Sequence, residues 1–161
     1  MSRPTKDEYF MAMAQLVATR TTCIRRAVGC VLVSIRGHVL ATGYNGVASG
    51  QPHCNQHDPF DMTGYPMACE GAFAGSGIAL DTCQAIHAEQ NALLQCSDIW
   101  AIDVCYCTTF PCVSCTKLLL GTSCRRIVYA EDYAQREAAE RLWMGAGRAS
   151  HMIAHTRGVK P

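Results

Sequence analysis

The chain has 161 residues, of which 49% are hydrophobic and 17% are charged, and its formal net charge is +1. This composition predicts one globular domain over residues 1–161 and excludes a disordered chain. The near-neutral charge argues against long nucleic acid as a partner. The charged first ten residues do not form a signal peptide, and no apolar run approaches the ~18 residues of a membrane span. We therefore expect no membrane partner and a cytoplasmic location, bacterial or in a virus-infected host.

The first half of the chain carries one helical pattern and two strand patterns. A helix is expected over residues 6–20, where Thr5 and Glu8 fit a capping box and apolar residues recur at helical spacing. Its stripe of Tyr9, Met13 and Leu16 is interpreted as the face that packs on the core. Two apolar runs separated by a short polar turn predict a β-hairpin, with strands over residues 27–35 and 39–43.

Residues 47–82 show no clean periodicity and are rich in Gly, Pro, His and Cys. An irregular stretch of this length inside a domain is usually functional or anchored. Beyond it the patterns return, with helices expected over 87–96, 111–121 and 132–143 and strands over 104–109, 126–130 and 149–154. Pro111 is placed in the first turn of its helix and Gly121 at its end. The order predicts an α/β fold with three layers, α/β/α, around a mixed sheet of about five strands.

Two short motifs carry metal-binding chemistry. An H-x-E motif has His87 and Glu89, and a P-C-x-x-C motif has Cys112 and Cys115. One imidazole and two thiolates leave the fourth tetrahedral position of zinc open, as in catalytic sites. Both motifs fall at predicted helix starts, where the helix dipole favours a thiolate. Glu89 is not needed as a ligand, and we expect it to carry protons between water and the substrate.

Each motif alone has little specificity, but the pair in this structural context is the signature of zinc-dependent nucleobase deaminases. A structural zinc knot or a chance match is the alternative. A zinc-stabilised binding module without catalysis is a further alternative, although it leaves Glu89 unexplained.

The sequence resembles the cytidine deaminase superfamily, and more closely the deoxycytidylate (dCMP) deaminases of bacteria and viruses, over about residues 9–133. The resemblance rests on residues 20–23, 28–29, 43–46, 53–54, 86–92 and 108–115. It implies hydrolytic deamination of dCMP to dUMP and ammonia, which supplies thymidylate synthesis. It also implies a homo-oligomer, with a hexamer favoured, that is activated by dCTP and inhibited by dTTP, usually with Mg²⁺.

The resemblance assigns roles to individual residues. It makes His87, Cys112 and Cys115 the zinc ligands and Glu89 the proton shuttle. Asn45 is expected to bond the deoxyribose, and the backbone of Ala88 to contact the base.

Other roles that the resemblance suggests concern regulation and the phosphate. The region of the nucleotide regulator matches Gly43, Tyr44, Gly46 and Gly50. For the phosphate we expect a contact from Arg25 or Arg26, and the alternative for either is a solvated surface charge.

Relatives often hold a second, structural zinc, and the leftover cysteines suggest one here. The expected ligands are Cys23, Cys54, Cys69 and Cys83, with His57 as a rival. A four-ligand zinc would anchor the irregular stretch. The alternatives are small apolar side chains or a disulfide.

The cysteines in the predicted strands, Cys30, Cys105 and Cys107, are interpreted as core packing. Among enzymes, the alternatives to a dCMP deaminase are a deaminase that also accepts dCTP, or one acting on a riboflavin intermediate or a tRNA base. The near-neutral charge and the lack of a basic arm weigh against tRNA.

Overall fold

The computed structural model describes residues 3–54, 71, 74–75, 77–79 and 82–153. Cys69 and His57, both considered as zinc ligands, lie outside the described residues. The elements in chain order are α1 (Lys6–Ala18), β1 (Gly29–Ser34), β2 (Val39–Tyr44), α2 (Ala88–Gln95), β3 (Ile102–Thr109), α3 (Val113–Leu120), β4 (Arg126–Glu131), α4 (Arg136–Gly145) and β5 (Ala149–Met152).

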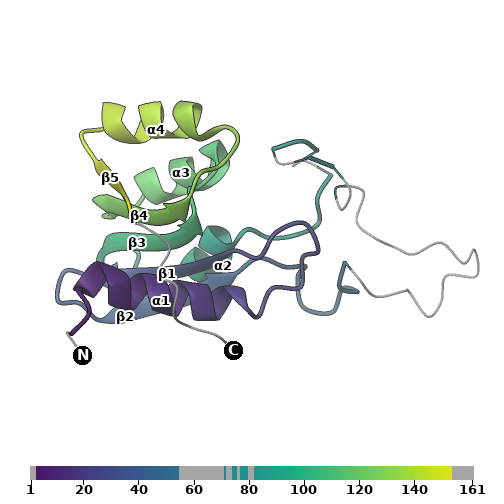
Figure 1. The fold of residues 1–161 in the computed structure, drawn as a ribbon, viewed down its shortest axis with the longest axis horizontal. Coiled ribbons are helices and arrows are strands. Elements are labelled where there is room, and N and C mark those ends of the chain that lie inside the picture. The colour runs from purple at the N-terminus through teal and green to yellow at the C-terminus, as the bar shows by residue number, and fades with distance from the viewer. Residues whose placement is uncertain (1–2, 55–70, 72–73, 76, 80–81, 154–161) are drawn as a thin grey trace, which may run out of the picture.

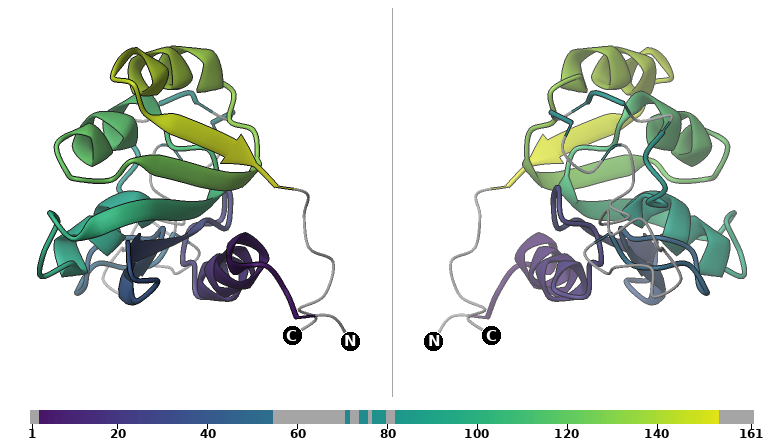
Figure 2. Two further views of the ribbon diagram at one scale, coloured as in Figure 1. Left: turned by 90° about the vertical axis from the view of Figure 1, so that its left-hand side faces the viewer. Right: turned by 90° about the vertical axis from the view of Figure 1, so that its right-hand side faces the viewer.

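The five strands form one mixed sheet in the order β2-β1-β3-β4-β5. β1 is antiparallel to both β2 and β3, whereas β3, β4 and β5 run parallel. Helix α1 lies on one face of the sheet, and α2, α3 and α4 lie on the other (Figures 1 and 2). The predicted hairpin and the predicted three-layer α/β/α fold are therefore confirmed.

The two faces follow from the period-2 alternation of side chains along the strands. One core cluster lies between the sheet and α2, α3 and α4, and includes Cys30, Leu32, Cys105, Cys107, Ile127 and Tyr129. The other lies under α1 and includes Val31, Val33, Val104, Tyr106 and Val128. The cysteines of β1 and β3 thus belong to the core on the α2 side, as expected.

The predicted apolar stripe of α1 is wrong at Tyr9 and Leu16, whereas Met13 is partly buried and packs against the core. Tyr9 is 52% exposed and Leu16 is 56% exposed, whereas Ala14 and Ala18 are buried. The reason lies in β1, because a Cβ atom at Gly29 would be only 2.0 Å from the carbonyl oxygen of Ala14. Where the helix backbone passes closest to β1, only the small residues Ala14 and Ala18 fit against the sheet, while Phe10 and Met11 are the large residues of α1 that are buried there.

The start of α1 nevertheless follows from the sequence. The Thr5–Glu8 capping box is present. Asp7, in the first turn, accepts two 2.9 Å bonds from the guanidinium of Arg126 and one of 2.7 Å from the Tyr106 hydroxyl. These contacts join the start of α1 to β3 and β4.

Two predicted helix starts need correction. Pro111 precedes α3, because Cys112 is the N-cap and Val113 is the first helical residue. Helix α4 begins at Arg136 rather than at residue 132, because the preceding chain turns Tyr133 towards the cavity described below. The Asp132–Arg136 ion pair of 2.7 Å joins this preceding segment to the helix.

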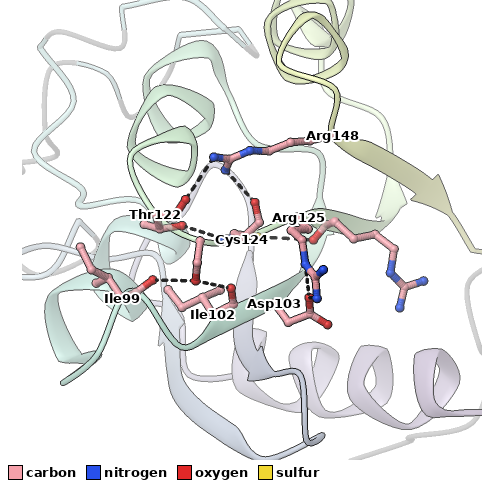
Figure 3. Close-up of polar contacts among 9 residues, drawn as sticks. Ile99, Ile102, Asp103, Thr122, Cys124, Arg125 and Arg148 are labelled. Atoms are coloured by element: carbon pink, nitrogen blue, oxygen red, sulfur yellow. Dashed lines mark hydrogen bonds and ion pairs between the residues drawn. The ribbon is translucent and has the colours of Figure 1, made fainter.

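The C-terminal end of α3 is held by Arg148, which lies just before β5. Its guanidinium donates to the carbonyl oxygens of Thr122 and Cys124 at 3.1 and 2.6 Å (Figure 3). It also donates to those of Leu119 and Leu120 at 3.0 and 2.9 Å. These carbonyls include orphan acceptors that a helix end leaves without intrahelical partners. One side chain therefore fixes the end of α3 opposite to the metal motif.

Among the described residues, no helix is long and apolar enough to cross a membrane.

Candidate metal centre and active site

Two residues of the metal motifs are the N-caps of neighbouring helices. His87 caps α2 and Cys112 caps α3, both with extended backbone. Cys115 is the third residue of α3, so its sulfur lies on the same side as that of Cys112. The expected position of both motifs at helix starts is therefore confirmed.

The three donor atoms all lie within 4.8 Å of one another. His87 Nδ1 is 3.5 Å from Cys112 Sγ and 3.4 Å from Cys115 Sγ. With Zn–N about 2.0 Å and Zn–S about 2.3 Å, tetrahedral angles place such donors about 3.5 Å apart. The residues present therefore fit one zinc ion with a fourth position open.

The two thiols differ in their tendency to ionise. Hydrogen bonding to Cys115, with a further contribution from His87, lowers the pKa of Cys112 to about 4. Next to this thiolate, the pKa of Cys115 is raised, first by its bond to Cys112 and then by burial. The protein alone thus favours one thiolate and opposes a second, and a divalent cation between the sulfurs would offset that repulsion.

Glu89 is the second residue of α2 and is only 4% exposed. Burial raises the pKa of its carboxyl group. A buried carboxyl with a raised pKa, lining a cavity beside three metal-ligand atoms, is suited to bind and release a proton during a reaction. This environment matches that of a general acid–base group.

A close contact with β2 sets the position of α2. A Cβ atom at Gly43 would lie 2.3 Å from the carbonyl oxygen of Ala88 and 2.4 Å from the amide nitrogen of Ala92. The first turn of α2, which carries Glu89, can therefore rest directly on the backbone of the strand. Glycine at this position of β2 is what allows the two backbones to come so close.

A cavity of about 330 Å³ opens over these groups. His87, Glu89 and Cys112 line it, as do the predicted substrate residues Ala88, Asn45, Arg25 and Arg26. Its volume lies at the lower end of the range for small-molecule sites. The fold thus brings to one cavity residues that are more than 80 positions apart in the sequence.

The Asn45 side chain is already occupied by protein partners. Its Oδ1 accepts bonds of 2.8 Å from the Val28 amide and from the Thr21 hydroxyl. Its Nδ2 donates to the carbonyl oxygen of Arg26 at 2.7 Å. One N–H of the amide remains for a ligand, and the contact with deoxyribose stays a prediction.

Two cavity residues were missed from the sequence. The Thr109 hydroxyl, at the end of β3, and the Tyr133 hydroxyl, just after β4, are buried without a partner among the described residues. Their positions in the sequence could have indicated this, because both residues lie at the carboxyl ends of adjacent parallel strands, where ligands bind in open α/β sheets. Tyr133 instead falls inside the helix that is expected from the sequence over residues 132–143.

The described part of the chain holds one metal-like group, that of His87, Cys112 and Cys115. Of the expected second set, Cys23 and Cys83 line the cavity, and Cys54 is buried near Val47 and Cys83. No disulfide joins any two of the ten described cysteines. The second zinc stays a prediction.

The four residues assigned to a nucleotide regulator have different surroundings. Gly43 is packed against α2, and a Cβ at Gly46 would meet the Thr22 hydroxyl at 2.2 Å. Tyr44 and Gly50 are exposed, and Gly50 has positive φ. The regulatory role of this loop is not tested by the geometry.

Comparison with known sequences decides the family. A family model described as "Cytidine and deoxycytidylate deaminase zinc-binding region" matches residues 4–131. The chain belongs to this deaminase family. Since the family is defined by zinc binding, zinc is the metal expected at the His–Cys–Cys group.

Individual relatives of this deaminase chain are named deoxycytidylate deaminases. The one from Schizosaccharomyces pombe is 40% identical over 148 residues, which is 90% of this chain and 43% of the relative. The one from Mycobacterium phage D29 is 38% identical over 82% of this chain and 99% of its own length. The chain thus spans less than half of the yeast relative but nearly all of the phage relative.

A solved structure supports the fold. The dCMP deaminase of cyanophage S-TIM5, in complex with dCMP and dUMP, superposes with a TM-score of 0.69 at 24% identity, covering 95% of this chain and 100% of that chain. At this identity the likeness shows the α/β fold of the deaminase and does not extend to its ligands.

Proposed function

We propose that this protein is a zinc-dependent deaminase that hydrolyses dCMP to dUMP and ammonia. The observation that carries the proposal is Glu89, a buried carboxyl that is not a ligand but lies in the cavity beside the three ligand atoms. The relatives named deoxycytidylate deaminases support dCMP as the substrate. A binding module would have no use for this carboxyl group.

The reaction replaces the amino group on C4 of cytosine with oxygen from water. Zinc held by His87, Cys112 and Cys115 would supply a Lewis acid that lowers the pKa of the attacking water. Glu89 accepts a proton from that water and delivers it to the ring nitrogen N3, while the oxygen of the water forms a bond to C4. Glu89 then takes the proton of the new C4 hydroxyl group and passes it to the amino group, so the C4–N bond breaks, ammonia leaves and the C4 carbonyl forms.

The substrate is held by the rest of the cavity. The backbone of Ala88 lies at the start of α2, next to Glu89, and is proposed to contact the pyrimidine. Asn45 has one free N–H for the deoxyribose. Arg25 and Arg26 both line the cavity, and we propose that one of the two guanidinium groups binds the phosphate through its N–H donors.

Exchange of Glu89 for Gln tests the function. This change keeps the size of the side chain and removes its proton transfer, so we expect ammonia release from dCMP to fall by about 10²–10⁴-fold. Zinc content, measured on the same sample, should be unchanged. Undiminished ammonia release with full zinc content would show that the mechanism is wrong.

The same assay separates the competing enzymes. dCMP, dCTP, CMP and deoxycytidine are each offered to the zinc-loaded protein, and ammonia is measured. We expect the highest kcat/KM with dCMP. A comparable value with dCTP would identify a bifunctional dCMP/dCTP deaminase, and activity on deoxycytidine alone would contradict the phosphate-binding cavity.

The proposal has a finer part, which concerns regulation, assembly and metal content. It includes activation by dCTP and inhibition by dTTP with Mg²⁺, a homohexamer, a second zinc and a cytoplasmic location. The exposure of Tyr44 and Gly50 leaves part of the 43–50 loop accessible to a nucleotide. Rates measured with dCTP or dTTP, with and without Mg²⁺, test the regulation, and mass photometry tests the hexamer. One zinc per chain, unchanged by Cys54→Ser, would exclude the second site.

A further inference from the structure

Two adjacent arginines line the cavity, and their guanidinium groups have different surroundings. Arg25 Nη2 donates to the carbonyl oxygens of Gly75, at 2.5 Å, and Ile78, at 3.1 Å. Arg26 Nη1 is buried and has no hydrogen-bond partner among the described residues. Buried polar atoms are nearly always paired in proteins. Arg26 therefore has a donor left for a ligand, whereas Arg25 binds the protein itself.

The partners of Arg25 belong to one turn, which we call the Gly75 turn and define by Gly75, Gly77 and Ile78. The Ile78 amide donates to the Gly75 carbonyl oxygen at 3.1 Å. On its other side, Gln135 Nε2 donates to the carbonyl oxygen of Gly77 at 3.3 Å. The turn is thus tied to the chain before β1 by Arg25 and to the chain before α4 by Gln135.

The Gly75 turn forms part of the cavity wall. Gly77 lines the cavity and has a φ of +78°, a backbone conformation that glycine adopts readily. A Cβ atom at this position would lie 3.4 Å from the Tyr133 hydroxyl. The turn therefore packs against Tyr133, which lines the same cavity, and its position affects the shape available to any ligand.

Arg26 is held at its backbone rather than at its side chain. Asn45 Nδ2 donates to the Arg26 carbonyl oxygen at 2.7 Å, and Asn45 is itself held by Val28 and Thr21. The start of the Arg26 side chain is therefore fixed, and its guanidinium group remains available. Preorganisation of this kind lowers the entropy cost of binding an anion.

We propose that the two arginines have separate tasks. Arg26 binds the phosphate of the nucleotide, and Arg25 is a positioning residue that ties the Gly75 turn against the cavity. The proposal rests on the proposed function, because it assumes a nucleotide in this cavity. It follows that Arg26 sets the preference for phosphorylated over unphosphorylated ligands, whereas Arg25 supports the binding of both.

Ligand binding to the zinc-loaded protein tests this division without any need for turnover. Isothermal titration is carried out with dUMP and with deoxyuridine, which differ by the phosphate alone. For Arg26→Gln we expect dUMP to bind about tenfold more weakly or worse, because a charge-assisted hydrogen bond is lost, while deoxyuridine changes less than about twofold. For Arg25→Gln we expect both ligands to weaken by the same factor. The matched control is Arg36→Gln, an exposed arginine between β1 and β2, which should change neither.

Amide hydrogen exchange in the ligand-free protein gives a second measurement that does not depend on either ligand. Arg25→Gln and Gln135→Ala should both speed exchange of the Ile78 amide, because each removes one tie to the Gly75 turn. Arg26→Gln should leave that rate unchanged.

Three results would overturn the division of tasks. They are a selective loss of dUMP binding in Arg25→Gln, an equal loss of both ligands in Arg26→Gln, and an Ile78 exchange rate unaffected by Arg25→Gln. Failure of the proposed function would look different. In that case the wild-type protein would release no ammonia from dCMP, even if dUMP binding and exchange followed the expected pattern.

Discussion

The chain uses cysteine in two regions with opposite chemistry. At the start of α3, hydrogen bonding to Cys115 and His87 lowers the pKa of Cys112 to about 4. In the sheet, a bond to Cys30 lowers the pKa of Cys107, but burial together with the charges of Glu89 and Cys105 outweighs it and raises the pKa to about 12. One side chain is thus prepared to be a thiolate and the other to remain a thiol.

The difference comes from backbone position and neighbours. Cys112 is a helix N-cap, where the backbone N–H groups favour negative charge, and an imidazole lies 3.5 Å away. Cys30 and Cys105 are fully buried on adjacent strands, with their sulfurs 3.6 Å apart and no cation beside them. Residue type alone therefore does not identify a metal ligand among the many cysteines of this chain.

The largest effect is expected from a substitution in the metal-binding region at the start of α3. Cys112→Ser removes a thiolate ligand, so the protein should lose one zinc per chain and ammonia release from dCMP should fall by on the order of 10³-fold or more. Metal analysis and the deamination assay measure the two effects. Cys105→Ser, a cysteine of the other region, is the control and should keep both. Full zinc content in Cys112→Ser would remove this residue from the ligand set.

The next effect concerns the core thiols. Cys105→Ser places a hydroxyl group among apolar neighbours, so the free energy of unfolding should fall by about 1–3 kcal/mol. Urea unfolding of the zinc-loaded protein measures this loss, and the kcat of the folded enzyme should stay within about twofold of the wild type, since Cys105 does not line the cavity. If Cys105→Ser lost zinc and kept the wild-type unfolding midpoint, Cys105 would be a metal ligand and not a core thiol.

A smaller effect should appear only at alkaline pH. An unfolded thiol ionises near pH ~8.5, whereas the raised pKa keeps folded Cys107 protonated to about 12. Unfolding therefore releases a proton above pH ~8.5, and stability falls as the pH rises through this window, by at most about 1.4 kcal/mol per pH unit. Cys107→Ala lacks this contribution, so its unfolding free energy should fall less steeply between pH ~8.5 and ~10. Parallel curves for the two proteins would contradict the assignment.

The smallest effect is expected for a cysteine outside both regions. Cys96 is the C-cap of α2, is partly exposed, and donates from its sulfur to the Asp98 carbonyl oxygen at 3.4 Å. A serine hydroxyl can make the same bond. Cys96→Ser should therefore change the unfolding free energy by less than about 0.5 kcal/mol, with zinc and activity intact. A larger loss would mean that Cys96 has a structural role beyond this bond.

The metal motifs were predictable from the sequence because their chemistry is local. His87 and Cys112 lie at helix starts that nearby residues specify, and the Thr5–Glu8 capping box starts α1 in the same way. The strands were also recognisable, since valine-rich runs fit the interior of a sheet.

Features that depend on distant contacts were not predictable. The buried face of α1 is decided by Gly29 on β1, so the large residues Tyr9 and Leu16 point outward despite their spacing. The tasks of Arg25 and Arg26 could not be separated, because the partners of Arg25 lie 50 and 53 residues further along the chain. The sequence around α1 does not indicate the contact with Gly29, and the sequence around Arg25 does not indicate the contacts with Gly75 and Ile78.

The contact between Gly43 and α2 has a consequence for how this protein tolerates mutation. Gly43 does not line the cavity, yet any side chain there would meet the backbone of Ala88 and Ala92 at less than 2.5 Å and displace the helix that carries Glu89. In a mutational scan for activity, substitutions of Gly43 should therefore be as damaging as substitutions of the catalytic residues, although Gly43 touches no ligand. During evolution, no other amino acid can replace Gly43 unless α2 shifts away from β2.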